Sequence, residues 1–209
     1  MTTILLLHGL WMSPFELGVL KRRIASADPR FNVLTFSYPS VTGSMSNHVR
    51  RLVEFAQAQK TERLHFVGHS LGGIVILRAL QLTNDLPPGR AVLLGSPLQG
   101  SRAARGVARL PLGKWILGSA IKEETIENVT RQWSGRRDVG VIAGSRGLGM
   151  GRLVANFDSD HDGTVLVNET LLPGAKDHIV LRTSHTGLLF SAEVADQAVY
   201  FLKEGCFRR

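Results

Sequence analysis

One stretch of the chain, RLHFVGHSLGGIVILRAL at residues 63–80, most constrains what it can fold into. An apolar run at residues 64–67 leads into a turn of small residues at 68–73, and a helical pattern follows at once. Where a strand turns sharply into a helix, the residues on either side of the corner lie too close together for side chains. Glycine at positions 68 and 72 removes this clash. The stretch therefore predicts a buried strand, a strained corner at Ser70, and a helix packed back on the strand.

The rest of the chain repeats this alternation of short apolar runs and amphipathic segments. Strands are predicted over residues 3–7, 32–36, 64–67, 91–94, 139–143 and 178–181. Helices are predicted over 14–27, 44–59, 71–82 and 191–203, with Ser13 as the cap of the first and Gly205 as the terminator of the last. This order predicts an α/β fold with three layers, α/β/α, around a mainly parallel sheet. We expect one domain over residues 1–209.

Composition narrows the functional classes. The single cysteine, Cys206, excludes a disulfide framework and a cysteine-based metal site within the chain. The net charge of +8 suits a weak attraction to an anionic membrane surface, but the basic residues follow no nucleic-acid-binding motif, so no nucleic-acid partner is expected. Because we identify no signal peptide and no apolar segment long enough to span a membrane in this sequence, we expect a cytoplasmic protein. The oligomeric state is left open.

Ser70 is the candidate nucleophile. The sequence Gly68-His69-Ser70-Leu71-Gly72 matches the Gly-x-Ser-x-Gly pattern that lifts a serine hydroxyl above the end of a sheet. The helix that begins after it brings the positive end of its dipole to the same point, where a developing oxyanion is stabilised. The alternative is that small residues only let this helix pack closely on its strand. The strand and helix on either side of the motif favour the catalytic interpretation.

A serine nucleophile needs a histidine base, and His185 is the candidate. In hydrolases built on this motif, the chain order is serine, acid, histidine. Of the histidines after Ser70, His178 opens the last predicted strand and would lie at its wrong end. His185 follows that strand and precedes the last helix, which is where the base is expected.

The acid is expected in the loop after the predicted strand at 139–143, which excludes Asp138. This loop contains Asp158, Asp160 and Asp162. Asp162 is favoured because Gly163 permits the tight turn that aims a carboxylate back towards the histidine. Asp160 is the rival, and an acid-rich turn can also be a solvated loop or a site for a hard cation.

The oxyanion hole is expected to use two backbone N–H groups, one from Leu71 after the nucleophile and one from Leu10 in the loop after the first strand. Gly9 allows the sharp exit from that strand. His8 precedes the serine in the chain, so its expected role is to brace this loop rather than to act as the base.

Together these motifs resemble the α/β-hydrolase superfamily, and within it the small bacterial lipases and esterases. Residues 95–101, Gly-Ser-Pro-Leu-Gln-Gly-Ser, are also similar to the Ser-Pro-His-x-Gly-Ser segment of lipases that attack long-chain lipids, with Leu98 in place of the histidine. The resemblance implies hydrolysis of a small-molecule ester or lipid through an acyl-serine intermediate, with no organic cofactor and no metal. An acyltransferase or thioesterase on the same triad, or a non-catalytic binding protein, are the alternatives.

Residues 97–138 break the regular alternation and are the candidate for a small lid or pocket wall. Trp115 lies in an apolar cluster within this segment, and Trp11 lies beside the predicted oxyanion loop. Both are candidates for an acyl pocket. Ordinary packing of a surface helix explains the Trp115 cluster equally well.

Overall fold

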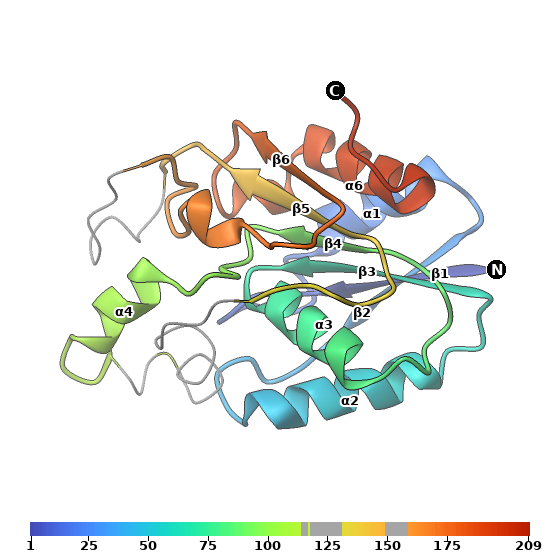
Figure 1. Cartoon of the computed structure of the whole chain (residues 1–209), viewed down its shortest axis with the longest axis horizontal. Coiled ribbons are helices and arrows are strands. Elements are labelled where there is room, and N and C mark those ends of the chain that lie inside the picture. Colours follow the sequence, from blue (N-terminus) through green and yellow to red (C-terminus); the bar gives the residue numbers. More distant parts are fainter. Residues whose placement is uncertain (114–116, 118–130, 149–158) are drawn as a thin grey trace.

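The computed structural model describes residues 1–113, 117, 131–148 and 159–209. Its centre is a six-stranded sheet in the order β2-β1-β3-β4-β5-β6 (Figure 1). Every neighbouring pair of strands in this sheet runs parallel. The strands are β1 (Thr2–Leu7), β2 (Phe31–Phe36), β3 (Arg63–His69), β4 (Ala91–Leu94), β5 (Val139–Gly144) and β6 (Asp177–Leu181). This confirms the predicted α/β fold with its parallel sheet.

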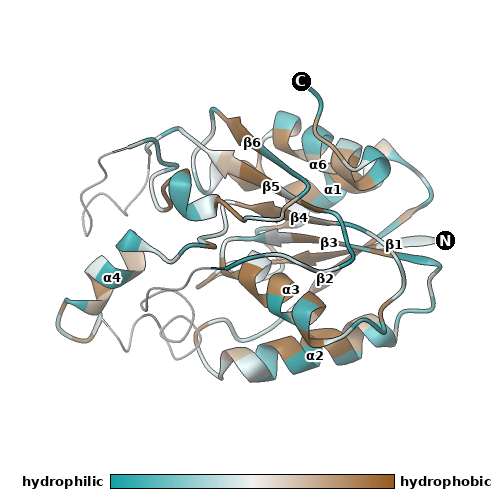
Figure 2. Cartoon of the chain, in the orientation of Figure 1, coloured by the Kyte–Doolittle hydropathy of each residue, from teal (hydrophilic) through white to brown (hydrophobic). Residues whose placement is uncertain are grey.

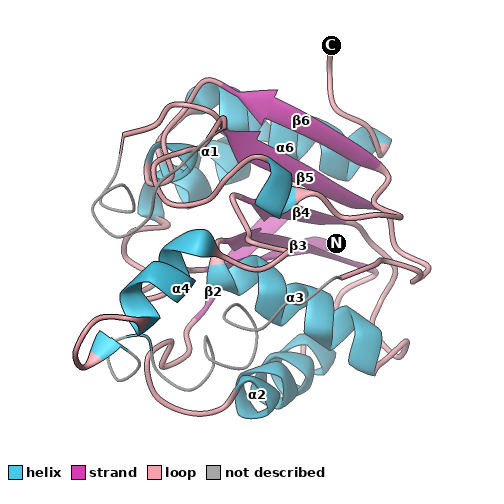
Figure 3. Cartoon of the chain, turned by 60° about the vertical axis from the view of Figure 1, so that its left-hand side comes forward, coloured by secondary structure: helices cyan, strands magenta, loops and turns pink. Residues whose placement is uncertain are grey.

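Helices cover both faces of the sheet (Figures 1 and 3). The helices are α1 (Gly18–Ala27), α2 (Met45–Gln57), α3 (Leu71–Leu82), α4 (Arg102–Ala108) and α6 (Ala192–Glu204). Helices α2 and α3 lie together on one face, and α1 and α6 lie together on the other. A crossover between parallel strands is usually made by a helix, so the alternation in the sequence favours this three-layer arrangement.

The core consists of one apolar layer on each face of the sheet. Along β1, Leu5 and Leu7 pack towards α2 and α3, whereas Ile4 and Leu6 pack towards α1 and α6. Successive side chains of a strand point to opposite faces, so a strand that is covered on both sides is expected to be largely apolar. Strands β1, β4 and β5 fit this expectation, whereas β3 also carries the buried His65 and His69 (Figure 2).

The structure corrects the predicted start of the first helix. Residues 14–17 form a turn, and α1 begins only at Gly18. Glu16 accepts hydrogen bonds from both the N–H and the hydroxyl of Ser13, at 2.9 and 2.7 Å, and these bonds close the turn before the helix. Ser13 therefore caps this turn and not α1. The predicted terminator of the last helix is confirmed, because Gly205 adopts a left-handed conformation with φ of 85°.

The segment predicted as a lid begins with a well-fixed stretch. Ser101 caps α4 by accepting a hydrogen bond from the N–H of Ala104 at 3.1 Å. The buried Glu169 holds the same helix end, because its carboxylate accepts from the N–H of Arg102 at 2.6 Å. Trp115, on which the lid and pocket prediction depends, lies outside the described residues. The lid stays a prediction.

In the parts of the chain that the structure describes, no helix is both long and apolar enough to cross a membrane.

Candidate active site

Ser70 lies at a strained corner at the carboxyl end of the sheet. β3 ends at His69, α3 begins at Leu71, and Ser70 between them has φ of 53° and ψ of −120°. A positive φ at a residue with a side chain costs on the order of 1–3 kcal/mol and persists only where the surrounding structure enforces it. The half-buried serine is therefore held in the conformation that the Gly-x-Ser-x-Gly pattern predicts.

The two glycines of the motif are required by different neighbours. A Cβ atom at Gly68 would lie 2.7 Å from the Cα of Gly73, in the first turn of α3. A Cβ atom at Gly72 would lie 2.6 Å from the carbonyl oxygen of His8, at the end of β1. Gly68 thus lets the helix fold back on its own strand, whereas Gly72 lets it approach the neighbouring strand.

His185 and Asp162 form a hydrogen-bonded pair. The Nδ1 atom of His185 lies 2.7 Å from the Oδ2 atom of Asp162, and the backbone N–H of His185 donates to the Asp162 carbonyl at 2.8 Å. The other carboxylate oxygen of Asp162 accepts from the N–H groups of Thr164 and Val165, at 2.9 and 2.7 Å. Because a carboxylate only accepts, Nδ1 carries the proton and Nε2 of His185 is left as the basic nitrogen.

Asp162 is 1% exposed. Burial alone would raise the pKa of this carboxyl, but His185 and the N–H groups of Val165 and Thr164 together hold the pKa below its ordinary value. An ionised carboxylate at this point orients the imidazole and stabilises the imidazolium that forms when His185 takes a proton.

The structure distinguishes between the two acids that the sequence left open. Asp160 is exposed, and its carbonyl oxygen accepts a hydrogen bond from the N–H of Val167 at 2.8 Å. Asp162, and not Asp160, is the carboxylate that contacts His185. The third aspartate of the loop, Asp158, lies outside the described residues.

Two glycines outside the motif, neither of them predicted from the sequence, make room for this pair. A Cβ atom at Gly95, which follows β4 with φ of 55°, would lie 3.1 Å from Oδ2 of Asp162 and 3.2 Å from Nδ1 of His185. A Cβ atom at Gly144, the last residue of β5, would lie 2.8 Å from the Cβ of Asp162. A glycine immediately after a predicted buried strand is the signal that marks such positions.

His69 is a further missed residue, and it connects the nucleophile to the base. Its Nε2 atom lies 3.0 Å from the backbone carbonyl oxygen of His185, and the two rings lie 4.6 Å apart. Burial lowers the pKa of His69 to about 3, so its ring is neutral at ordinary pH. Since a carbonyl only accepts, the single ring proton is on Nε2, and His69 donates it to the main chain of His185.

The predicted oxyanion loop lies against the nucleophile. A Cβ atom at Gly9 would lie 3.1 Å from the Cβ of Ser70. Leu10 is partly buried against the core, while Trp11 is 57% exposed and has φ of 56°. Leu71 is the first residue of α3, so its N–H is among those that the helix itself leaves without an intrahelical partner.

No hydrogen bond joins the Ser70 hydroxyl to His185 in the described part of the chain. In enzymes without substrate, this contact is often long and tightens when substrate binds.

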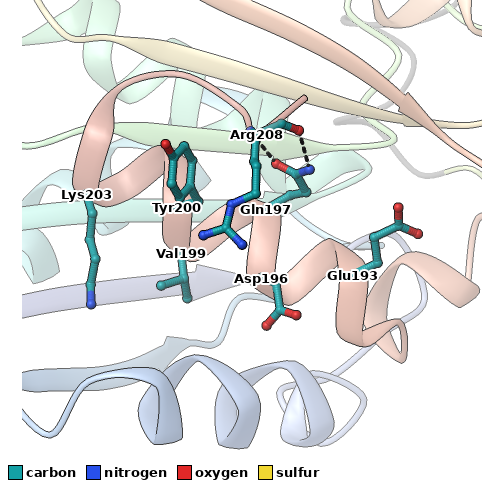
Figure 4. A pocket seen from close by; sticks show the side chains of 7 residues that line it. All are labelled: Glu193, Asp196, Gln197, Val199, Tyr200, Lys203 and Arg208. Atoms are coloured by element: carbon teal, nitrogen blue, oxygen red, sulfur yellow. Dashed lines mark hydrogen bonds between the residues drawn. The ribbon is translucent and has the colours of Figure 1, made fainter.

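Two hollows on the described surface lie away from these residues. One, of about 540 Å³, lies along α6 and is lined by charged and aromatic side chains, among them Asp196, Tyr200 and Arg208 (Figure 4). The other, at the amino ends of the strands, is lined by residues such as Asp28 and His65. Neither contains Ser70 or its partners, so a large hollow alone does not locate the chemistry here.

Comparisons with known proteins agree with this fold. The model of the alpha/beta hydrolase family matches residues 4–197. A search of curated proteins finds no match. Solved structures are similar at low sequence identity, which shows the fold alone.

Three of these similar structures illustrate the likeness. The mature form of the Bacillus licheniformis lipase BlEst2 has a TM-score of 0.70 at 18% identity, over 90% of this chain and 86% of that one. Phospholipase PlaB from Legionella pneumophila has a TM-score of 0.71 at 13% identity, over 96% of this chain and 55% of that one. The thioesterase RedJ from Streptomyces coelicolor has a TM-score of 0.61 at 12% identity, over 96% of this chain and 84% of that one.

The chain spans about half of the propeptide form of the Bacillus licheniformis lipase, 47% of its length. The family match, in contrast, covers nearly all of this chain, with the Ser70 corner and the Asp162–His185 pair inside it. The chain therefore belongs to the alpha/beta hydrolase family.

Proposed function

We propose that this protein is a serine hydrolase that cleaves carboxylic esters through an acyl-serine intermediate. The observation that carries the proposal is the 2.7 Å contact between His185 and the buried Asp162, at the same edge of the sheet as the strained Ser70. A serine hydroxyl is a poor nucleophile without a base, and a histidine held by a carboxylate is the group that activates it.

The proposed reaction has two halves. The Ser70 oxygen forms a bond to the ester carbonyl carbon while Nε2 of His185 takes the hydroxyl proton, and the backbone N–H groups of Leu10 and Leu71 receive the oxyanion. The bond to the alcohol then breaks, and His185 returns the proton to the departing oxygen. In the second half, water replaces the serine by the same steps, and the carboxylic acid leaves.

The test is hydrolysis of p-nitrophenyl acetate, butyrate and palmitate by the wild-type protein and by Ser70→Ala. We expect wild-type turnover of at least one ester, and a loss in kcat of about four to six orders of magnitude in the variant. The chain-length profile then separates an esterase from a lipase. Activity that survives in Ser70→Ala would overturn the proposal.

Thioester hydrolysis is the second candidate, because the structurally similar proteins include the RedJ thioesterase. The same triad serves both reactions, since only the leaving group differs. An N-acetylcysteamine thioester and a p-nitrophenyl ester with the same acyl chain, compared by kcat/KM, distinguish the two. Acyl transfer would appear as faster release of the leaving group when an alcohol acceptor is added.

A non-catalytic binding protein is the remaining alternative. It predicts no turnover of any of these substrates and no covalent labelling of Ser70.

Trp11, beside the oxyanion loop, and Trp115 are proposed to contact the acyl chain. Trp11→Ala and Trp115→Ala variants that leave the chain-length profile unchanged would contradict this.

A further inference from the structure

Tyr38 contacts the loop that is proposed to stabilise the oxyanion. Its hydroxyl donates a hydrogen bond to the carbonyl oxygen of His8 at 2.8 Å. Tyr38 lies two residues beyond β2, the strand that runs beside β1 with Phe36 opposite Leu7. It is 4% exposed, and burial raises the pKa of its phenol, so the hydroxyl keeps its proton and acts as a donor.

A second hydrogen bond fixes the next peptide group of the loop. The Nδ1 atom of His8 lies 2.9 Å from the carbonyl oxygen of Gly9 and donates a hydrogen bond to it. That carbonyl belongs to the same peptide as the N–H of Leu10, and the two groups of a planar trans peptide point in opposite directions. Fixing the Gly9 carbonyl on the His8 ring therefore sets the direction of the Leu10 N–H.

The Tyr38 ring holds the His8 ring in place. The two rings are stacked with centroids 4.5 Å apart and planes 15° from parallel. On its other sides Tyr38 contacts Phe36 and the buried His48 of α2, with ring centroids at 6.1 and 5.0 Å. Tyr38 thus contacts both elements that define the loop, the His8 carbonyl through its hydroxyl and the His8 ring through its face.

The same carbonyl also lies against the helix of the nucleophile. A Cβ atom at Gly72 would lie 2.6 Å from the His8 oxygen, so this oxygen is held between the Tyr38 hydroxyl and the first turn of α3. The position of the loop relative to Ser70 therefore depends on where Tyr38 holds it.

We propose that Tyr38 is a positioning residue for the oxyanion hole, acting through His8 and the Gly9–Leu10 peptide. The inference rests on the proposed function, because it assigns the Leu10 N–H to the oxyanion. Displacements of about 1 Å at a reacting centre lower rates by about a hundredfold, so loss of one hydrogen bond to the loop is expected to have a smaller but measurable effect.

The test compares Tyr38→Phe with Tyr200→Phe. Tyr38→Phe removes the hydroxyl and keeps the stacked ring. The chain has two tyrosines, and Tyr200 lies on α6 beside Arg208, away from the catalytic residues (Figure 4), which makes it the matched control. Each variant is measured for kcat, KM, thermal midpoint and the number of titratable active sites.

We expect Tyr38→Phe to lower kcat about tenfold with KM within about twofold of the wild type. Binding of an aryl trifluoromethyl ketone, whose adduct with the serine carries an oxyanion, is expected to weaken by the same factor as kcat/KM. Tyr200→Phe is expected to match the wild type in all of these measurements.

Three results would overturn the inference. One is a Tyr38→Phe variant with wild-type kcat. Another is a fall in rate that is fully explained by fewer titratable sites or by unfolding, which would mean a structural role only. The third is unchanged affinity for the trifluoromethyl ketone. Failure of the proposed function is recognised separately, because the wild-type protein itself would then neither turn over esters or thioesters nor react with the ketone, and the inference would fall with it.

Discussion

The aspartates at the two ends of the sheet have different side-chain partners. At the amino ends of the strands, carboxylates pair with cations: Asp28 with Arg30 and Lys203 at 2.8 and 2.9 Å, Asp138 with Arg90 at 3.1 Å, and Asp177 with Arg209 at 2.7 Å. At the carboxyl ends, Asp162 contacts a histidine and two backbone N–H groups.

Backbone strain separates the two ends as well. Ser70 and Trp11, with φ of 53° and 56°, both follow carboxyl ends of strands. Strained backbone lowers the stability of the fold wherever it occurs, whereas ion pairs close to the surface contribute modestly to that stability. This difference supports the proposal that the chemistry takes place at the carboxyl end, whereas the ion pairs at the amino end help to hold the chain together.

Changing one carboxylate at each end, Asp162 and Asp28, tests this difference most strongly. Asp162→Asn keeps the shape of the side chain but loses the charge that orients His185. We expect kcat to fall by about 10⁴-fold, as when the tautomer of a triad histidine is wrong. Steady-state hydrolysis of the best ester substrate measures it.

Asp160→Asn is the matched control for this change, since Asp160 lies in the same loop and is exposed. We expect its kcat to stay close to that of the wild type. If Asp160→Asn abolishes activity and Asp162→Asn does not, the acid has been assigned to the wrong residue.

Buried neutral histidines are a feature that both ends share, and they predict how stability depends on pH. Burial lowers the pKa of His65, near the amino end of β3, to about 4, and that of His69 to about 3. In the unfolded chain both take up protons near pH 6.5. Below pH 6.5 the unfolded state therefore binds more protons, and the folded state loses stability as the pH falls.

Between pH 7 and pH 5, this loss is on the order of 4 kcal/mol for the two groups together. Urea unfolding at the two pH values measures it. His65→Asn, which keeps an acceptor for the N–H of Arg90, is expected to remove the contribution of His65, about 2 kcal/mol. A free energy of unfolding that is constant over this range would contradict the neutral state of these histidines.

His69 is a buried group at the carboxyl end, and we expect it to hold His185 in place as well as to pack against it. Replacing it with Phe keeps a ring beside His185 and removes the 3.0 Å hydrogen bond to its carbonyl. We expect His69→Phe to lower kcat about a hundredfold, since the base is then held less firmly relative to the nucleophile. His69→Gln, which offers a donor at a similar place, is expected to recover part of the loss. Equal losses in both variants, with equal loss of thermal stability, would indicate packing alone.

The smallest effect is expected at the amino end. The hydrogen bonds from Arg30 and Lys203 lower the pKa of Asp28, so its charge stabilises the fold above about pH 4, and this contribution is lost as the pH falls further. Asp28→Asn is expected to lower the thermal midpoint by about 2 °C at pH 7, less at pH 3, and to leave kcat unchanged. A large loss of activity in this variant would break the division between the two ends.

Much of the fold could be predicted from the sequence, because local pattern and burial agree. The strand at 91–94 and the helix at 71–82 have the predicted bounds, since each is a largely apolar segment that is followed by a small or polar residue. The start of α1 could not be predicted in the same way. A serine followed three residues later by a glutamate is a signal for a helix start, yet here the pair closes a separate turn.

Two residues of the candidate site could be predicted from the sequence. Ser70 was identified by its local motif, and His185 by its position in the chain order. Asp162 was favoured over Asp160 because Gly163 follows it, but the structure was needed to show which of the two carboxylates contacts His185. Tyr38 and His69 were missed because their contacts join residues 30 and 116 positions apart in the chain, a distance that no local pattern encodes.

The central claim is that Ser70 is an activated nucleophile, and covalent labelling tests it most directly. The wild-type protein and Ser70→Ala are treated with a fluorophosphonate and measured by intact mass, followed by peptide mapping. The account predicts one adduct per chain, located on Ser70, and none in Ser70→Ala. An unlabelled wild-type protein, or an adduct that persists in Ser70→Ala, would contradict it.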